Sequence, residues 1–400
     1  MTIMTLALLA LTAASWAFWL VALAAVQRHV RARSPAPPPA FPMVSLLKPV
    51  RGVDPGAREN FESFFRLEYP TFELLFAVAD PDDPVLPLLE TLRREHPRIP
   101  VQILVAPAPG PNRKADLLHA LARAALAPVL VVTDGDMRVE PSYLREVVGA
   151  LSQPGVGLVT CAYRGAEPAS LPARLEALHM GVTFLPSAVV ASRVFGVPFA
   201  MGATMALRRS DLDAIGGFAP LADHLADDYQ LGARVAALGR RIVVCRHVVT
   251  SVLGRTSFRD GWDREVRWAR CTRASRPLGH VGYALTFATP LGAAAFLASG
   301  GAPVGIAALA GSLALRWAVA AGISRATGDG ASLRALPLLP LRDALTAAVW
   351  AVALFGHRVV WRGEAFDVDR AGRLRPRSPP VPASPRAGAA SADRGAARGA

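Results

Sequence analysis

The chain has 400 residues, of which 52% are hydrophobic and only 19% charged, and its net charge is +13. That length accommodates a full catalytic domain together with membrane segments. The basic residues lie beside an apolar run and in a C-terminal tail, without a zinc-finger or RNA-binding signature, so we expect no nucleic-acid partner. Three distant cysteines without a CxxC pair indicate neither a disulfide framework nor a zinc site.

The first predicted element is a continuous uncharged run from Ile3 to Val26. As a helix, this run would reach roughly 36 Å, enough to cross a hydrocarbon core of about 30 Å. A cleaved signal peptide is the alternative, because small alanines lie near the end of the run. However, no positive charge precedes it, whereas three arginines and a histidine follow within residues 28–33. This order favours an uncleaved anchor over residues 1–27 and a basic, proline-rich linker over residues 28–42, with the next domain in the cytoplasm.

Residues 43–276 alternate short apolar runs with amphipathic helical stretches. We expect strands at Val44–Leu47, Leu74–Ala79, Val101–Val105 and Val129–Thr133, and helices at Pro55–Arg66, Pro84–Glu95, Lys114–Leu126 and Pro141–Leu151. Strands alternating with helices predict an α/β, Rossmann-like domain with a parallel, doubly wound sheet. Such sheets bind ligands beyond the carboxyl ends of their strands.

Charge nearly vanishes after residue 276, which predicts a C-terminal membrane region over residues 277–370. Val281–Ser299 and Val304–Ile323 are both long enough to span a bilayer. Ala344–Gly356 is short for a span, so a third crossing and an interfacial or re-entrant helix both remain open. Residues 371–400 are rich in arginine, proline and alanine and are expected to be disordered. We therefore expect a multi-pass protein of the inner membrane. The sequence leaves its oligomeric state open.

The strongest chemical motif is Asp134-Gly135-Asp136, directly after the apolar strand Val129–Thr133. Two carboxylates at this spacing can hold a divalent ion, Mg²⁺ or Mn²⁺, against a diphosphate. A solvated turn is the alternative. A second acidic group, Asp80, Asp82 and Asp83, also follows a strand and can accept hydrogen bonds from a nucleobase and a ribose. An Asp/Pro turn would look the same.

Two further groups lie later in the chain. Asp228 opens a helical stretch, where a carboxylate serves equally well as a helix cap or as a general base. Arg264, Arg267 and Trp268 precede the apolar region, where arginine suits a diphosphate and tryptophan suits a membrane interface. Lys114, at the start of a helix, is either a phosphate ligand or a surface residue.

The order of these elements (strand–Asp, strand–DxD, helix–DD, RxxRW) resembles family 2 and family 21 glycosyltransferases of the GT-A fold. The segment from Val44 through Pro55 is similar to the first strand of ceramide glucosyltransferases, and the resemblance covers residues 44–276. Within that superfamily, three segments look more like the hopanoid glycosyltransferases: GLVTCAYRG at 157–165, ADHLADDY at 222–229 and RWAR at 267–270.

The resemblance implies a role for each candidate. Asp80 or Asp83 would bind uridine, with Lys114 and Arg267 also contacting the donor. Asp134 and Asp136 would hold the diphosphate and its metal. Asp228 would be the general base of an inverting transfer. The acceptor or the pyrophosphate would be bound by Arg264, which stands where many relatives carry glutamine, and by Trp268.

The resemblance implies N-acetylglucosamine transfer from its UDP donor to a hopanoid lipid, bacteriohopanetetrol. The alternatives are a ceramide glucosyltransferase that uses UDP-glucose and a non-catalytic membrane scaffold on the same fold. The scaffold would have lost its base or metal ligands, yet Asp134, Asp136, Asp228 and Arg267 are all present.

Overall fold

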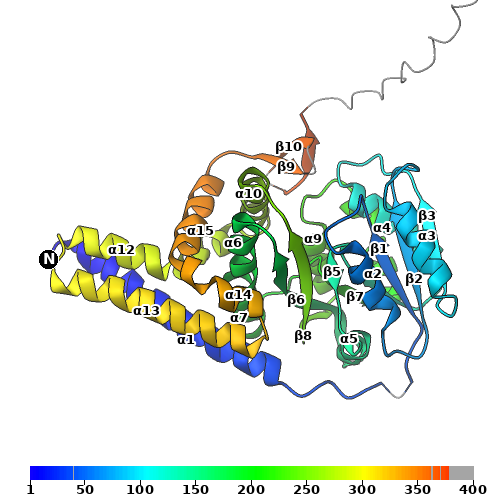
Figure 1. Ribbon diagram of the computed structural model, residues 1–400, viewed down its shortest axis with the longest axis horizontal. Coiled ribbons are helices and arrows are strands. Elements are labelled where there is room, and N and C mark those ends of the chain that lie inside the picture. Colours follow the sequence, from blue (N-terminus) through cyan, green and yellow to red (C-terminus); the bar gives the residue numbers. More distant parts are fainter. Residues whose placement is uncertain (39, 362–363, 370, 378–400) are drawn as a thin grey trace, which may run out of the picture.

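The computed structural model describes residues 1–38, 40–361, 364–369 and 371–377 of the chain. Its centre is an eight-stranded mixed sheet with the order β3-β2-β1-β4-β7-β6-β8-β5 (Figure 1). The strands are β1 Val44–Pro49, β2 Phe72–Val78, β3 Val101–Val105, β4 Val129–Val132, β5 Met137–Arg138, β6 Val156–Pro168, β7 Met205–Arg208 and β8 Arg241–Gly254.

The first half of the sheet confirms the expected alternation. Strands β1 to β4 are parallel, and β1 and β4 are buried along their whole length. The connecting helices are α2 Ala57–Phe65, α3 Leu86–Glu95, α4 Arg113–Ala124 and α5 Tyr143–Leu151. In α4, Ala115, Leu118 and Leu121 turn one apolar face to the sheet, and Asn112 caps the helix by accepting from the Ala115 N–H.

The expectation of a parallel sheet is wrong in the second half. β7 runs antiparallel to both β4 and β6, and β5 runs antiparallel to β8. The remaining helices of this domain are α8 Arg209–Ala214 and α9 Asp227–Ala237, with a short 3₁₀ turn at Ala219–Leu221. The antiparallel β7 matters because the loop before it returns to the end of β4, where the Asp134 motif lies.

Apolar helices project from one side of the sheet domain (Figure 1). α1 Ile3–Arg31, α12 Ala288–Ala298 and α13 Pro303–Ala326 pack together, and α15 Leu339–Leu354 lies between them and α10 Phe258–Ser275. Short segments link them: α11 Pro277–Gly282, 3₁₀ turns at Tyr283–Thr286 and Leu336–Leu338, and α14 Gly330–Ala335. Among the described residues, four helices are long and apolar enough to cross a membrane, or up to five if one bent pair counts as a span.

These helices correct several expectations. α1 runs on to Arg31, so the first basic residues belong to the helix and not to a linker. The segment expected at Val281–Ser299 breaks at Phe287 and bends by 68°. The third C-terminal segment is longer than expected, since the apolar stretch Gly330–Leu354 has 25 residues. Leu171–Arg193, made of α6 Leu171–His179, a π-helical turn and α7 Leu185–Arg193, is also long and apolar enough for a span, which the sequence analysis does not predict, and most of it is buried in the protein.

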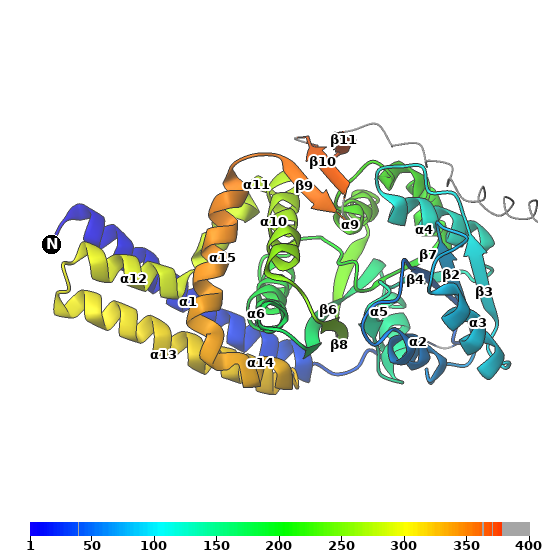
Figure 2. The same ribbon diagram turned by 45° about the horizontal axis from the view of Figure 1, so that its top comes forward.

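A small second sheet follows α15. Its strands are β9 Arg358–Trp361, β10 Glu364–Val368 and β11 Leu374–Pro376, in antiparallel order β11-β10-β9. We call it the C-terminal sheet. The expectation of disorder from residue 371 is therefore wrong for β11, and residues 378–400 lie outside the described part of the chain. In Figure 2, β9 runs from the end of α15 past α10 towards α9.

Candidate active site

The Asp134 motif leaves the carboxyl end of β4 at the middle of the sheet. Asp134 keeps about a third of its side chain exposed (34%). Asp136 is held inward, with Oδ2 accepting a 2.7 Å hydrogen bond from the Ser251 hydroxyl on β8. Burial, and then the neighbouring carboxylates of Asp134 and Asp54, raise the pKa of Asp136 to about 6. The loop thus concentrates negative charge at the end of a buried strand.

Lys114 connects this loop to α9. Its Nζ lies 2.7 Å from Asp134 Oδ1 and 3.4 Å from Asp227 Oδ2. Burial lowers the pKa of Lys114, but the carboxylates of Asp134, Asp227 and Asp228 outweigh burial, so the net direction is upward. The lysine is therefore a fixed cation between the two acidic elements, and not the surface residue that was the alternative.

Asp228 lies across the same space. Its Oδ2 accepts from the Gly202 N–H at 3.0 Å and its Oδ1 from the Tyr229 N–H at 2.7 Å. The N-cap position of α9 belongs to Ala226, which makes no side-chain cap bond, so Asp228 does not act as the N-cap. Burial and then Asp227 raise the pKa of Asp228 to about 6. A carboxyl with that pKa suits a general base near neutral pH.

Gly202, in the loop before β7, marks where these groups meet. A Cβ at this position would lie 2.9 Å from Asp134 Oδ2 and 3.0 Å from Lys114 Nζ, while the Gly202 N–H binds Asp228. We call Lys114, Asp134, Asp228 and Gly202 the Gly202 cluster. Sequence reasoning missed Gly202, because a lone glycine in the run FAMGATM carries no signal of what approaches it.

Asp80 and Asp83 take different places. Asp83 is buried, and its two oxygens accept from the Gly52 N–H at 2.9 and 3.0 Å, while Oδ1 also accepts from the Val85 N–H. Its carboxylate therefore fastens the loop after β1 to the loop after β2. Asp80 is exposed, and its Oδ1 accepts from the Asp82 N–H at 2.9 Å. Of the two, Asp80 is the exposed carboxylate.

The RxxRW motif lies on α10. Arg264 Nη1 lies 2.9 Å from Glu176 Oε1 on α6, and Glu176 is buried. The guanidinium of Arg267 lies over the ring of Trp361 in the C-terminal sheet, 5.6 Å from its centroid. Trp268 is partly buried against the cluster of Ala173, Ala177, Met180, Leu253 and Ala331. Arg264 thus fastens α10 to α6. This structural role accounts for an arginine at position 264 without any contact to a substrate.

Lys48 is a further residue that sequence reasoning missed. It is fully buried in β1, and its Nζ donates to Thr133 Oγ1 at 2.7 Å and to the Asp134 carbonyl at 3.0 Å. The ammonium also lies 3.8 Å from the Phe64 ring centroid. Burial lowers the pKa of Lys48 to about 7, against the opposing pull of Asp134 and Asp136. The signal was a lone lysine in the apolar strand VSLLKP.

The residues present fit a divalent cation in part. Asp134 and Asp136 supply carboxylate oxygens, and a Cβ at Gly135 would lie 3.6 Å from Asp54 Oδ2, so a third carboxylate is close. Within the described ranges, however, no group of three or more His, Cys, Asp or Glu side chains is arranged to hold a metal. An ion with six or more oxygen ligands would need others from a diphosphate or water. The pair suits a metal that arrives with its substrate.

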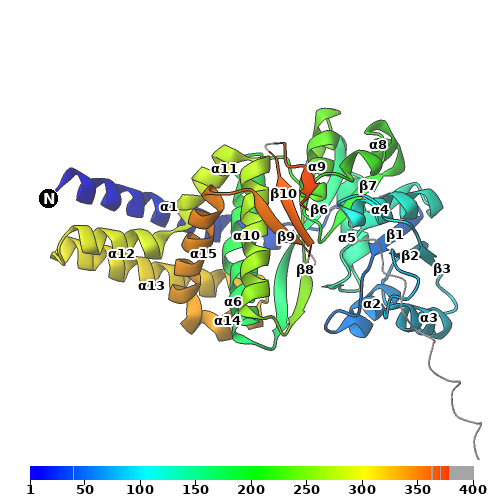
Figure 3. The ribbon, with the colours of Figure 1, turned by 90° about the horizontal axis from the view of Figure 1, so that it is seen from above.

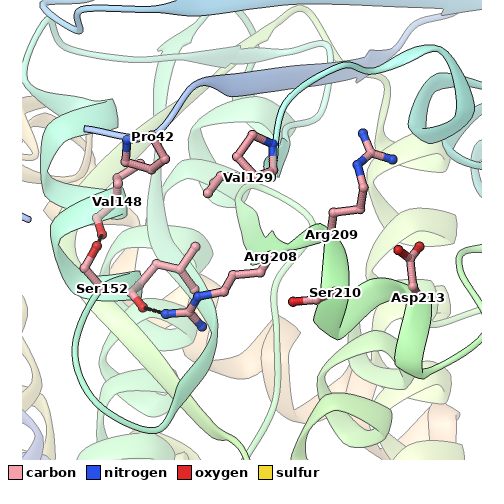
Figure 4. Close-up of a pocket in the computed structure, with 10 residues that line it drawn as sticks. Pro42, Val129, Val148, Ser152, Arg208, Arg209, Ser210 and Asp213 are labelled. Carbon is pink, nitrogen blue, oxygen red and sulfur yellow. Dashed lines mark hydrogen bonds between the residues drawn. The ribbon is translucent and has the colours of Figure 1, made fainter. Parts of the chain in front are cut away.

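A separate pocket of about 460 Å³ lies at the opposite end of the strands, at the start of β4 (Figure 4). Arg208 and Arg209 line it, but their guanidinium groups donate to main-chain carbonyls: Arg208 to Leu151 and Val156, and Arg209 to Ala122, Ala125 and Ala127. These arginines therefore close the fold between helices and strands. This pocket lies at the wrong end of the strands for the acidic motifs.

Comparisons with known proteins agree with this geometry. The mannosyltransferase PcManGT from Pyrobaculum calidifontis, solved with GDP-Man and Mn²⁺, superposes with a TM-score of 0.53 over 88% of this chain and 99% of its own, at 21% identity. At that identity the likeness shows the fold, which is a mixed α/β fold of the GT-A type.

Sequence relatives point the same way. Ceramide glucosyltransferase 1 of Caenorhabditis elegans is 26% identical over 243 residues, covering 60% of this chain and 52% of the relative. Ceramide glucosyltransferase of Komagataella phaffii is 28% identical over 133 residues, covering 32% and 26%. The chain thus spans about half the length of the first relative and less of the second. The model of glycosyl transferase family 21 matches residues 2–374. The chain belongs to glycosyl transferase family 21.

Proposed function

We propose that this protein transfers a hexose from a UDP-sugar to the hydroxyl of a membrane lipid, with inversion at the anomeric carbon. The observation that carries the proposal is the Gly202 cluster. In this cluster Gly202 lies between Asp228 and the ion pair of Asp134 with Lys114. We assign Asp228 as the base and the ion pair to the side of the site that takes the donor phosphates. Because Gly202 has no side chain, its backbone can approach Asp134 and Lys114 closely while its N–H binds Asp228.

The chemistry is a single displacement. Asp228 takes the proton of the acceptor hydroxyl, whose oxygen forms a bond to C1 of the sugar as the bond from C1 to the UDP oxygen breaks. Negative charge then grows on the diphosphate, where Lys114 and Arg267 provide positive charge. A divalent cation held by Asp134 and Asp136 would supply further charge neutralisation at the diphosphate. Asp80, exposed at the end of β2, is our candidate for the uridine.

The acceptor is proposed to be a lipid because the site adjoins apolar helices. α10, which carries Arg267 and Trp268, packs directly against α15. We propose N-acetylglucosamine and a hopanoid as the first substrate pair, from the resemblance at residues 157–165, 222–229 and 267–270. Glucose and ceramide are the second pair, favoured by the names of the sequence relatives.

One assay tests both pairs. Purified enzyme in lipid would receive UDP-GlcNAc or UDP-glucose, each with bacteriohopanetetrol and ceramide as competing acceptors, and products would be read by mass spectrometry. The Asp228→Asn variant is the matched control for enzyme-dependent transfer. A glucosylated ceramide as the main product would overturn the first pair, and no transfer to either lipid would overturn the lipid-acceptor proposal.

We further propose that the protein lies in the inner membrane with its sheet domain in the cytoplasm, where nucleotide sugars are made. Arg28 and Arg31 close α1 at the end nearest the sheet domain. A reporter fused after Pro42 tests this orientation. It is expected to behave as cytoplasmic, and periplasmic activity of the fusion would reverse the topology.

A further inference from the structure

The C-terminal sheet lies where the two sides of the candidate site meet. In Figure 3, β9 and β10 lie between α10, which carries Arg267, and α9, which carries Asp228. Strand β9 packs against α10. The apolar side chains of this sheet, Val359, Phe366, Val368 and Leu374, form one buried cluster with Leu225 from the loop before α9, and Cys271 and Ala274 of α10 pack against it.

Main-chain bonds tie the sheet to the loop before Asp228. The Leu225 N–H donates to the Gly372 carbonyl at 3.0 Å, and the Leu374 N–H donates to the Asp223 carbonyl at 2.7 Å. His224 also forms an isolated bridge with Arg373. Residues 223–225 are therefore held by backbone contacts that do not depend on exposed side chains. Asp227 and Asp228 follow two and three residues later.

Arginines of α10 hold the start of the same sheet. Arg270 donates to the carbonyls of Phe355 and Arg358, and Arg273 donates to those of Leu354 and Gly356. The C-terminal sheet thus fixes α9 and α10 relative to each other. Within it, Trp361 is the residue whose ring faces the Arg267 guanidinium, 5.6 Å from its centroid, a distance suited to a cation–π contact.

We infer that the C-terminal sheet is part of the catalytic apparatus and that Trp361 is a positioning residue, which holds the Arg267 guanidinium in the orientation used on the donor diphosphate. The inference rests on the proposed function. A ring above the guanidinium restricts a long side chain with many rotamers, and it does so by contacting the flat face of the group. Trp361 therefore acts through Arg267 and not on the substrate.

The test compares Trp361→Phe with Trp361→Leu. Both keep apolar volume in the cluster, but only Phe keeps a ring over the guanidinium. We expect Trp361→Leu to lower kcat roughly 3- to 30-fold, the range of a cation–π contact, and Trp361→Phe to recover most of that loss. Because charge on the leaving diphosphate develops in the transition state, the KM for the UDP-sugar is expected to change less than kcat.

The control is Glu364→Gln. Glu364 is the cross-strand neighbour of Trp361 in the β9–β10 pairing, and its ion pair with Arg113 is half exposed and worth little. The Glu364→Gln variant should leave kcat unchanged. A second measurement is the effect of Trp361→Leu in an Arg267→Ala background, where it should be much smaller than in wild type.

Each outcome decides a different point. Equal losses in Trp361→Phe and Trp361→Leu, or the same loss with and without Arg267, would mean that Trp361 only packs and would overturn the inference. Normal kcat in Trp361→Leu would do the same while leaving the proposed function intact. Absence of wild-type turnover with every donor and acceptor pair would overturn the proposed function, and the inference with it.

Discussion

Lys114 Nζ lies 2.7 Å from Asp134 Oδ1. This ion pair joins α4 to the acidic loop after β4, and because the same ammonium reaches Asp227 it also joins that loop to α9. Lys114 is protonated at neutral pH, because the surrounding carboxylates raise its pKa despite burial. A donor diphosphate entering here would meet this charge at once.

We therefore predict that Lys114→Met lowers kcat/KM by roughly two to three orders of magnitude, as expected when one preorganised charge is removed from a transition state. Steady-state kinetics with varied UDP-sugar measures it. Arg113→Met, one residue earlier and half exposed, is the control and should stay near wild type. A Lys114→Met enzyme with unchanged kcat/KM would show that the lysine only holds α4 in place.

Asp228→Asn separates chemistry from folding. The amide keeps an oxygen for the Gly202 N–H but loses basicity. Transfer is expected to fall by roughly two to four orders of magnitude. UDP-sugar affinity should stay near wild type. A folded, donor-binding variant that turns over normally would rule out the base assignment.

The direction of the stability change in Asp228→Asn follows from the pKa of Asp228. The pKa of Asp228 is about 6 in the folded protein, above its ordinary 3.8. A raised acid pKa stabilises the fold below the unfolded value, and that contribution is lost as pH rises through 6. Asp228→Asn should thus unfold at the same or a higher temperature than wild type at pH 7.5. A lower melting temperature would indicate that the bonds from the Gly202 and Tyr229 N–H groups to the Asp228 carboxylate stabilise the fold by more than its charge costs.

The pH dependence of transfer follows from the same group. Asp228 acts as a base only when ionised, so kcat should rise with pH, bend near about pH 6 and level off above it. Rates from about pH 5 to pH 8 at saturating donor would show this bend. UDP affinity measured across the same range separates an effect on binding from one on the chemical step. A kcat profile flat through pH 6 would contradict the assignment.

The acidic loop and its strand could be predicted from sequence, because a short apolar run that ends in Asp134 favours a buried strand with carboxylates at its carboxyl end. The first four strands and helices followed from the same alternation. Asp83 shows the limit of such reasoning. The sequence allowed either a uridine contact or an Asp/Pro turn at this position. The Asp83 carboxylate accepts three bonds from main-chain N–H groups, as expected for a residue that holds a turn.

Other parts depend on contacts between distant segments. The approach of Gly202 to Asp134 follows from β7 running antiparallel to β4, and nothing local predicts that direction. Arg264 was ambiguous until Glu176 was found beside it. The sequence of β9 to β11 predicts partly membrane and partly disorder, because these strands are short and their charges are mixed. Only packing against α10 and residue 225 orders it as a sheet.

Metal removal tests the acidic loop. If Asp134 and Asp136 hold a divalent ion with the donor, activity should vanish in EDTA and return with Mg²⁺ or Mn²⁺. Asp136→Asn should raise the metal concentration needed for half-maximal activity. Ser251→Ala is the matched control: it removes the hydroxyl that binds Asp136 Oδ2 but leaves both carboxylates. Full turnover in exhaustively chelated enzyme would show that the loop works without metal.

A buried ion pair joins the apolar helices to the site. Arg342 of α15 makes two bonds to Glu265 of α10, at 2.6 and 2.7 Å, and both side chains are buried. Glu265 lies between Arg264 and Arg267, so this pair sets the position of the RxxRW motif against α15. Removing one partner leaves a buried charge uncompensated, which costs roughly 3–5 kcal/mol.

We therefore predict that Arg342→Leu strongly lowers the melting temperature of the purified protein and its kcat, while Arg342→Leu with Glu265→Leu recovers most of the stability, because no charge is left buried. The double variant should still lose activity if the pair also positions Arg267. Arg58→Leu is the control: its 2.5 Å ion pair with Glu95 is similarly short but exposed, so this variant should melt close to the wild-type temperature. Equal melting temperatures for Arg342→Leu and Arg58→Leu would show that the buried pair does not fasten α10.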